Sequence, residues 1–193
     1  MEKARDYYSF VFRGLLTEQS LDNAGRQSKG AFTDKLYQEF SGRLGLPLLD
    51  EELVISAKRM SVVYTAICAF ENYVRDFVSK KLIEVKGESW WNNSVSEKIR
   101  KKAESRKTEE SNTKWHTPRG ESLINYTEFG DLVSIIQQNW DHFEPHIISL
   151  DWARHIVESL EKSRNVIMHS GELAAQDIER VGMNIRDWIR QVG

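Results

Sequence analysis

The six residues 164–169, RNVIMH, close a strongly helical stretch just before Ser170 and include three side chains capable of chemistry. Arg164, Asn165 and His169 place a guanidinium, an amide and an imidazole within about one and a half helical turns. A guanidinium neutralises phosphate charge, and an imidazole exchanges protons near neutral pH. In RNA the 2′-hydroxyl beside each phosphodiester is a built-in nucleophile, so these groups supply what cleavage needs without a metal ion. The run therefore predicts acid–base chemistry on a phosphodiester.

The pattern around this run predicts which of its side chains face the protein interior. At about 100° per residue on an ideal helix, Asn165 and His169 share a polar face, whereas Arg164 lies near the edge of the apolar stripe. That stripe consists of Trp152, Ile156, Leu160 and Ile167. Because a partly buried guanidinium needs a partner, Arg164 should contact an acidic residue from elsewhere in the chain.

Glu71 is the predicted partner. The same angular count puts it within about 20° of Met60 and Val78, near the centre of another apolar stripe, where an unpaired carboxylate is costly. We expect a bidentate Glu71–Arg164 pair, which would fix the plane of the guanidinium and leave its other donors free for a phosphate. Arg75, one turn along from Glu71, is expected to border the same spot.

A single copy of the run looks incomplete, because Arg164 and His169 lie on different faces of a straight helix. A two-fold dimer would bring two copies together. By themselves the six residues favour a plainer interpretation, a capped helix end with a solvated ion pair. The expected burial of Glu71 reverses that judgement, as does the wider pattern described below.

The chain is predicted to be all-α. Only three prolines interrupt it, and apolar residues recur every three or four positions without sustained alternation of period two. Phe32, Leu36 and Phe40 indicate a first helix, which Gly45 and Pro47 should end. The longest helix is expected over residues 50–83. Its inward stripe should contain Met60, Val63, Tyr64, Ile67, Val74, Val78 and Leu82.

Later helices are expected over residues 95–106, 127–140, 150–169 and 175–192. Gly171 is the expected stop for the helix that carries the RNVIMH run. These ranges indicate two parts, a helical extension over residues 1–46, whose role the sequence does not determine, and a helical domain over residues 50–193 that forms one compact unit.

Composition narrows the class of protein. The formal net charge of −2 and the pI near 6.2 argue against a chain that is basic throughout, but they allow a local basic patch. The one cysteine, Cys68, excludes an intrachain disulfide and a cysteine zinc cage, which fits a reducing compartment. No apolar run approaches membrane-spanning length, and residues 1–12 lack the apolar core of a secretion signal. We therefore expect a cytoplasmic protein without membrane contact.

A basic patch is expected between residues 98 and 119, where eight Lys or Arg face three Glu. The patch could track an RNA backbone, with Trp115 stacking on a base. The candidate RNA-binding residues are Lys98, Arg100, Lys101, Lys102, Arg106, Lys107 and Trp115. A solvated helix and loop, whose charges only maintain solubility, is an equally good interpretation.

Other candidates are weaker. His142 and His146 have the spacing of a helical metal pair, but Pro145 disrupts that register, so no metal site is expected. Trp90 and Trp91 are interpreted as packing residues at a helix–helix corner, and Cys68 as a small buried hydrophobe. Phosphate-binding glycine loops and nucleophile elbows are absent from the sequence, which removes most nucleotide hydrolases and serine hydrolases.

Taken together, these motifs resemble the HEPN superfamily, whose signature is Arg, a polar residue, three variable residues and His at a helix end. The signature here is Arg164, Asn165 and His169. The chain is also similar to the HEPN subgroup found in a nuclear mRNA quality-control endonuclease and its bacterial relatives. That subgroup's pattern appears as ENYVR at 71–75, WW at 90–91, EFGDL at 128–132, Trp140 and Phe143. The resemblance covers roughly residues 64–188.

The resemblance implies a helical bundle with a long central helix and additional N-terminal helices. It also implies a homodimer whose composite, cofactor-free site cleaves RNA to a 2′,3′-cyclic phosphate and a 5′-hydroxyl. Arg164, Asn165 and His169 would be its catalytic residues, supported by Glu71 and Arg75. Such domains act as toxins or antiviral effectors, which implies an antitoxin or another regulatory partner.

One departure concerns that control. HEPN toxins silenced by nucleotide addition carry a tyrosine two residues after the His, where this chain has Gly171. Two other functions remain open from sequence. A non-catalytic HEPN module would bind RNA or nucleotide, or only mediate dimerisation, and an antitoxin-like or immunity subunit would restrain another protein.

Overall fold

The structure, a computed structural model, describes Thr17, Ser20 and residues 34–193, and its first described helix ends where the sequence predicts. Helix α2 spans Asp34–Arg43 and a 3-10 turn, η1, spans Leu46–Leu48. Gly45 between them has a left-handed φ of 68°, which ends the helix, and Pro47 lies in the first turn of η1. Phe32, expected to begin this helix, lies outside the described residues, as does most of the expected extension over 1–46.

The chain divides into two compact units, Met1–Glu51 and Glu52–Gly193. The elements that follow η1 are α3 (Glu51–Lys86), α4 (Trp90–Ser94), α5 (Glu97–Ser111), η2 (Leu123–Tyr126), α6 (Phe129–Gln138), α7 (Trp140–Phe143), α8 (Leu150–Met168) and α9 (Ala175–Val192). Every element in the described part of the chain is helical, which confirms the predicted all-α class.

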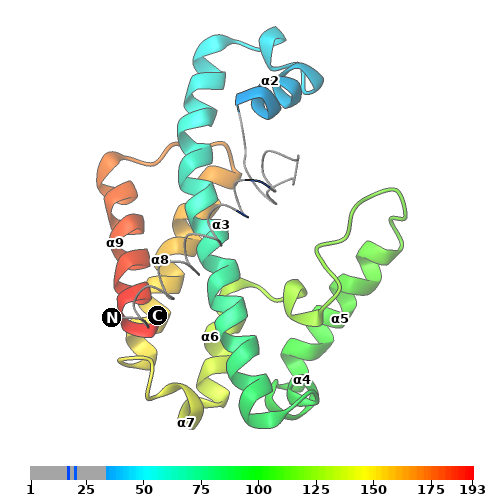
Figure 1. Cartoon of the computed structure of the whole chain (residues 1–193), viewed down its shortest axis with the longest axis vertical. Helices are drawn as coiled ribbons and strands as arrows, with labels where there is room; N and C mark the ends of the chain where they lie inside the picture. The colour runs from blue at the N-terminus through cyan, green and yellow to red at the C-terminus, as the bar shows by residue number, and fades with distance from the viewer. Residues whose placement is uncertain (1–16, 18–19, 21–33) are drawn as a thin grey trace. The chain divides into compact units, whose positions relative to one another are not determined.

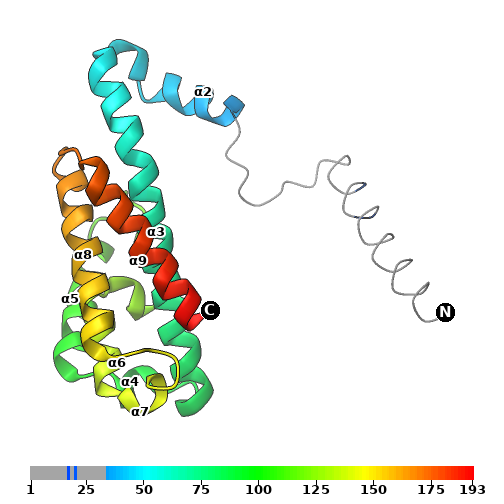
Figure 2. The same cartoon turned by 90° about the vertical axis from the view of Figure 1, so that its left-hand side faces the viewer.

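Helix α3 is the axis of the second unit. Both views place α8 and α9 alongside it, and α5 projects from the side of α3 opposite α9 (Figures 1 and 2). The three long helices meet at Trp188 of α9. Its ring stacks on Trp152 of α8 with centroids 5.4 Å apart, and it meets Phe70 of α3 edge-on at 5.7 Å. These aromatic contacts fix where α8, and therefore the RNVIMH run, lies against α3.

The buried stripe of α3 confirms most of the expected core. Its buried residues are Met60, Val63, Ile67, Phe70, Val74, Val78 and Leu82. The prediction that Tyr64 points inward is wrong, because its side chain is exposed. Phe70, which the predicted stripe omitted, is buried and only 3% exposed. In the N-terminal half of α3, apolar residues occur on every face of the helix, so the sequence pattern alone does not show which face meets the core.

Two residues of the predicted inward stripe of α8 are less buried than expected. Trp152 and Ile167 are only half-buried, whereas Ala153 and Val157 are completely covered. Helix α8 packs against both α6 and α9, so its buried arc is wider than a single stripe. Ile167 lies at the end of the helix, where fewer neighbours cover it.

The later boundaries are mostly as predicted. Helix α9 has the expected bounds, and α5 runs five residues beyond the expected 106, to Ser111. The expected helix over 127–140 is interrupted at Asn139, whose side-chain amide donates to the carbonyls of Ser94 and Ile135 at 2.8 and 2.9 Å. The Asn139 amide satisfies the Ile135 carbonyl at the point where the helical hydrogen bonds are interrupted, and its bond to the Ser94 carbonyl joins the end of α6 to α4.

The expectation that no segment reaches membrane-spanning length was wrong for α3. Its most apolar 18-residue window has a mean hydropathy of 1.4, and 22% of that window is buried, so length and composition alone would allow the helix to cross a membrane. The same helix supplies seven buried residues to the core, as the central helix of a folded domain does.

Candidate active site

Glu71 lies at the centre of the candidate site and binds two arginines. One carboxylate oxygen, Oε1, accepts from Arg75 Nη2 at 2.7 Å, and Oε2 accepts from Arg164 Nη1 at 2.8 Å. The side chains of Glu71, Arg75 and Arg164 are 12%, 13% and 23% exposed. The predicted Glu71–Arg164 pair is therefore confirmed. The predicted bidentate geometry is wrong, because the carboxylate is shared and each guanidinium contributes one nitrogen.

The two arginines differ in how many donors they have left. Arg75 also donates from Nε to the Ile124 carbonyl at 3.2 Å and from Nη1 to Asn72 Oδ1 at 2.6 Å, so all three of its nitrogens are used. Within the described residues, Arg164 has one further partner, Glu161 Oε1, 3.8 Å from Nη2. Arg75 therefore ties α3 to η2, while Arg164 keeps donors for a ligand.

His169 ends helix α8 in a Schellman arrangement. The amide of Ser170 donates to the Ile167 carbonyl at 2.9 Å, and that of Gly171 donates to the Val166 carbonyl at 2.8 Å. The left-handed residue is Ser170, with φ 61°, and not Gly171 as expected. Gly171 is required for another reason: a Cβ there would lie 2.8 Å from Val166 Cγ1 and 3.0 Å from the Val166 carbonyl oxygen.

The loop after His169 is anchored on α3. The hydroxyl of Ser56 donates to the Glu172 carboxylate, and the amide of Leu173 contacts Met60 Sδ at 3.3 Å. Asn165 and His169 are exposed, and their side chains have no hydrogen bond or ion pair with any described residue. The amide and the imidazole are thus presented to solvent at an anchored helix end, where a ligand can reach both.

Tyr64 and Cys68 are the residues that sequence reasoning missed here. They precede Glu71 at helical spacing, so Tyr64, Cys68, Glu71 and Arg75 follow one face of α3. A hydrogen bond with the Cys68 thiol raises the pKa of the Tyr64 hydroxyl above its usual value of 10.0. The charge of Glu71 adds to the shift, and that of Arg164 opposes it. The i, i+4, i+7 spacing of Tyr64, Cys68 and Glu71 was the available signal. The thiol is half-buried, so it is less enclosed than expected.

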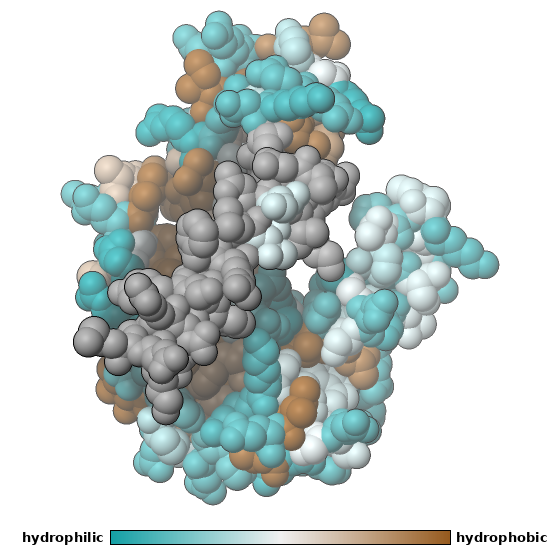
Figure 3. All heavy atoms as spheres, viewed as in Figure 1, coloured by the Kyte–Doolittle hydropathy of each residue, from teal (hydrophilic) through white to brown (hydrophobic). Residues whose placement is uncertain are grey.

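Most of the candidate RNA-binding cations are engaged within the protein. Lys102 and Arg106 bind the carboxylate of Glu128, and Lys102 lies 3.8 Å from Asp131. The remaining contacts are Lys101 to Glu97 at 2.6 Å, Arg100 to the Val95 carbonyl at 3.1 Å and Lys107 to the Glu121 carbonyl at 2.6 Å. Figure 3 shows the surface of α5 as mainly hydrophilic. Lys98 has no partner among the described residues, and Trp115 is 86% exposed.

Glu128 links α5 to the start of α6. Hydrogen bonding from Lys102 and the charge of Arg106 lower the pKa of its carboxyl below the usual 4.5. Its backbone amide donates to Asp131 Oδ2 at 2.9 Å at the start of α6. This part of the basic run therefore joins α5 to the start of α6, and no hydrogen bond or ion pair among the described residues links it to Arg164 or His169.

The minor candidates occupy structural positions. Trp90 is 7% exposed and meets Trp91 edge-on at 5.5 Å, which confirms packing at a helix corner. His142 and His146 are half-buried, and the His146 ring meets Phe77 at 5.9 Å. Across the described residues, no three His, Cys, Asp or Glu side chains gather as a metal site would require.

Comparison with known proteins identifies the family. The Swt1-like HEPN family matches residues 66–193, which is about two thirds of the chain and includes both Glu71 and the RNVIMH run. No curated protein and no solved structure matches the chain. HEPN domains are generally ribonucleases. The chain belongs to the HEPN superfamily, as a member of its Swt1-like HEPN family.

Proposed function

We propose that this protein is a metal-independent endoribonuclease that cleaves RNA by attack of a 2′-hydroxyl on the adjacent phosphate. The products would be a 2′,3′-cyclic phosphate and a 5′-hydroxyl. The observation that carries the proposal is the Arg164–Glu71 pair at 2.8 Å. It holds a partly buried guanidinium one and a half turns before an exposed histidine on the same helix.

Each residue has a distinct part in the proposed reaction. The free donors of Arg164 would bind the non-bridging oxygens as charge develops on the phosphorane. His169 would remove the proton of the 2′-hydroxyl or protonate the departing 5′-oxygen. The Asn165 amide would hold the phosphate or orient the imidazole. Glu71 is a positioning residue, and Arg75 acts through it by occupying the second carboxylate oxygen.

A homodimer would complete this site, because one His169 cannot act as base and acid in the same step. A two-fold axis near the end of α8 would bring in a second imidazole. Large apolar side chains are exposed around the site, as an interface requires. They include Met168 at 61% and Tyr64 at 36%.

Regulation by a separate partner is part of the proposal, since an unrestrained ribonuclease would damage host RNA. This partner would be an antitoxin or another regulator, and the host process would be toxin–antitoxin control or antiviral defence in the cytoplasm. Nucleotide addition at residue 171 does not fit this chain, because Gly171 has no side-chain hydroxyl to accept the nucleotide.

The test is cleavage of mixed-sequence RNA in EDTA by wild type, His169→Ala and Arg164→Ala. His142→Ala is the control, because this histidine lies outside the site. Wild type and the control should yield 2′,3′-cyclic phosphate ends, and the two site variants should lose activity by about 100-fold or more. Equal cleavage by His169→Ala would contradict the assigned site. If a folded wild type leaves every RNA intact, the non-catalytic module becomes the better description.

A further inference from the structure

A cleft of about 420 Å³ lies between α8 and α9, on the face of α8 that turns away from Glu71. The proposed reaction makes no use of it. Its volume is within the range of small-molecule sites. The cleft is lined by His155, Glu158, Ser159, Lys162, Ser163, Val166, Leu173, Asp177 and Arg180.

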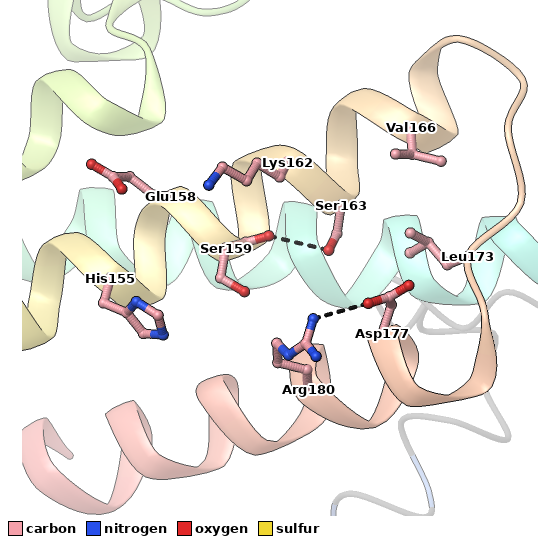
Figure 4. A pocket seen from close by; sticks show the side chains of 9 residues that line it. All are labelled: His155, Glu158, Ser159, Lys162, Ser163, Val166, Leu173, Asp177 and Arg180. Atoms are coloured by element: carbon pink, nitrogen blue, oxygen red, sulfur yellow. Dashed lines mark hydrogen bonds and ion pairs between the residues drawn. The ribbon is translucent and has the colours of Figure 1, made fainter.

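The cleft offers donors, acceptors and one aromatic ring at close quarters. Figure 4 shows His155 and Ser159 of α8 pointing toward α9, from which Arg180 and Asp177 point back. Asp177 Oδ1 accepts from Arg180 Nη1 at 2.9 Å. In the described part of the chain this is the one contact of either side chain, so Asp177 Oδ2 and the remaining guanidinium nitrogens are available. Val166 and Leu173 supply an apolar end.

That apolar end adjoins the proposed reaction centre. Val166 follows Asn165 in the RNVIMH run, and His169 lies three residues beyond it, so the two are neighbours on the helix surface. Leu173 follows the same loop and is anchored by its contact with Met60. A nucleotide next to a phosphate held at His169 would therefore lie within reach of the cleft.

The mixed charges restrict what the cleft can bind. Glu158 and Asp177 disfavour a bare phosphate, while Lys162 and Arg180 disfavour a purely apolar ligand. A nucleobase meets both conditions, because its faces stack on imidazole or guanidinium and its edge carries donors and acceptors. Guanine matches the adjacent pair on α9: its N1–H and N2–H groups donate to a carboxylate, and its O6 and N7 accept from a guanidinium.

We propose that the α8–α9 cleft is a guanine-binding subsite for the RNA strand, with Asp177 and Arg180 reading the base edge and His155 stacking on its face. The inference rests on the proposed ribonuclease function, which it deepens by assigning a base preference beside the cleavage point. Lys162 at the rim of the cleft would meet the backbone phosphate of the bound nucleotide.

The first test measures binding and does not depend on cleavage. His169→Ala protein is titrated with uridine hexamers that carry one central guanine, adenine, cytosine or hypoxanthine. The guanine hexamer should bind about tenfold more tightly than the adenine and cytosine hexamers. Hypoxanthine, which lacks the N2 amino group, should fall between them. Asp177→Asn should abolish the preference, while Glu179→Gln, at an exposed neighbouring position of α9, should retain it.

Cleavage mapping on random-sequence RNA with the otherwise unchanged protein provides the second arm. Guanine should be enriched at one fixed position relative to the cut, and Asp177→Asn should flatten that enrichment among the cuts that it still makes. Guanine-selective binding without any cleavage would support the subsite and remove the ribonuclease proposal. RNA cleavage with equal binding of all four hexamers would overturn the subsite and leave the ribonuclease proposal standing. Circular dichroism of each variant shows whether it is folded.

Discussion

Replacing Glu71 by glutamine tests whether one shared carboxylate organises the site. The variant keeps the size of the side chain and one carbonyl oxygen, but it removes the charge that compensates Arg75 and Arg164. Both guanidiniums would then remain partly buried beside each other. Removing one partner of a buried pair costs about 3–5 kcal/mol, and exposed pairs contribute about 0.2–1 kcal/mol.

The three side chains are 12–23% exposed, which places the expected cost of Glu71→Gln between these limits. We expect a loss of about 2 kcal/mol, allowing for the acceptor that the amide retains. For a domain of this size, that loss lowers the melting temperature by about 7 °C. Arg164→Gln should cost less than Glu71→Gln, because Glu71 would still bind Arg75.

Thermal and urea unfolding followed by circular dichroism measure this cost. Glu161→Gln is the matched control, since its carboxylate lies 3.8 Å from Arg164 and the side chain is 32% exposed. The control should change stability by less than about 0.5 kcal/mol. If Glu71→Gln and Glu161→Gln unfold at the same urea concentration, the reasoning from the shared carboxylate is refuted. In the cleavage assay Glu71→Gln should lower kcat more than it raises KM, because Arg164 would be present but misoriented.

Two further predictions concern helix ends. Ser170→Gly should raise the free energy of unfolding by about 0.5 kcal/mol, because glycine adopts the left-handed φ of 61° without a steric cost. A Ser170→Ala protein as stable as the Ser170→Gly protein would contradict this reasoning. Glu128→Gln should destabilise the protein near neutral pH. The lowered pKa of Glu128 means that its contribution is complete above the usual 4.5 and is lost as pH falls through the lowered value. Urea unfolding from pH 7 to pH 3 should therefore show the two proteins converging in acid, and a constant difference would exclude Glu128 as the cause.

Local pattern was sufficient for much of this protein. The spacing of apolar residues located α9 at its observed bounds and α8 to within one residue of its expected end. Angular position alone also identified Glu71 as a buried carboxylate and Arg164 as its partner. These inferences succeeded because helix geometry converts sequence spacing directly into direction, and because a buried charge must be paired.

The same reasoning failed where packing supplies the information. Tyr64 is apolar and correctly spaced, yet it faces outward, because the N-terminal half of α3 carries more apolar residues than the core covers. The basic run of α5 suggested a free surface. Two of its cations, Lys102 and Arg106, instead bind the carboxylate of Glu128, which caps α6, a helix whose position no local count could supply.

The sequence by itself determined that the chain is helical, that it carries the HEPN signature, and that Arg164 needs Glu71. Tertiary structure alone decided that Glu71 serves two arginines and that α8 and α9 enclose a cleft beside His169. The physical reason is the separation in sequence of the residues that interact. Secondary structure and burial follow from residues three or four apart, whereas shared partners and clefts arise when helices distant in sequence pack against one another.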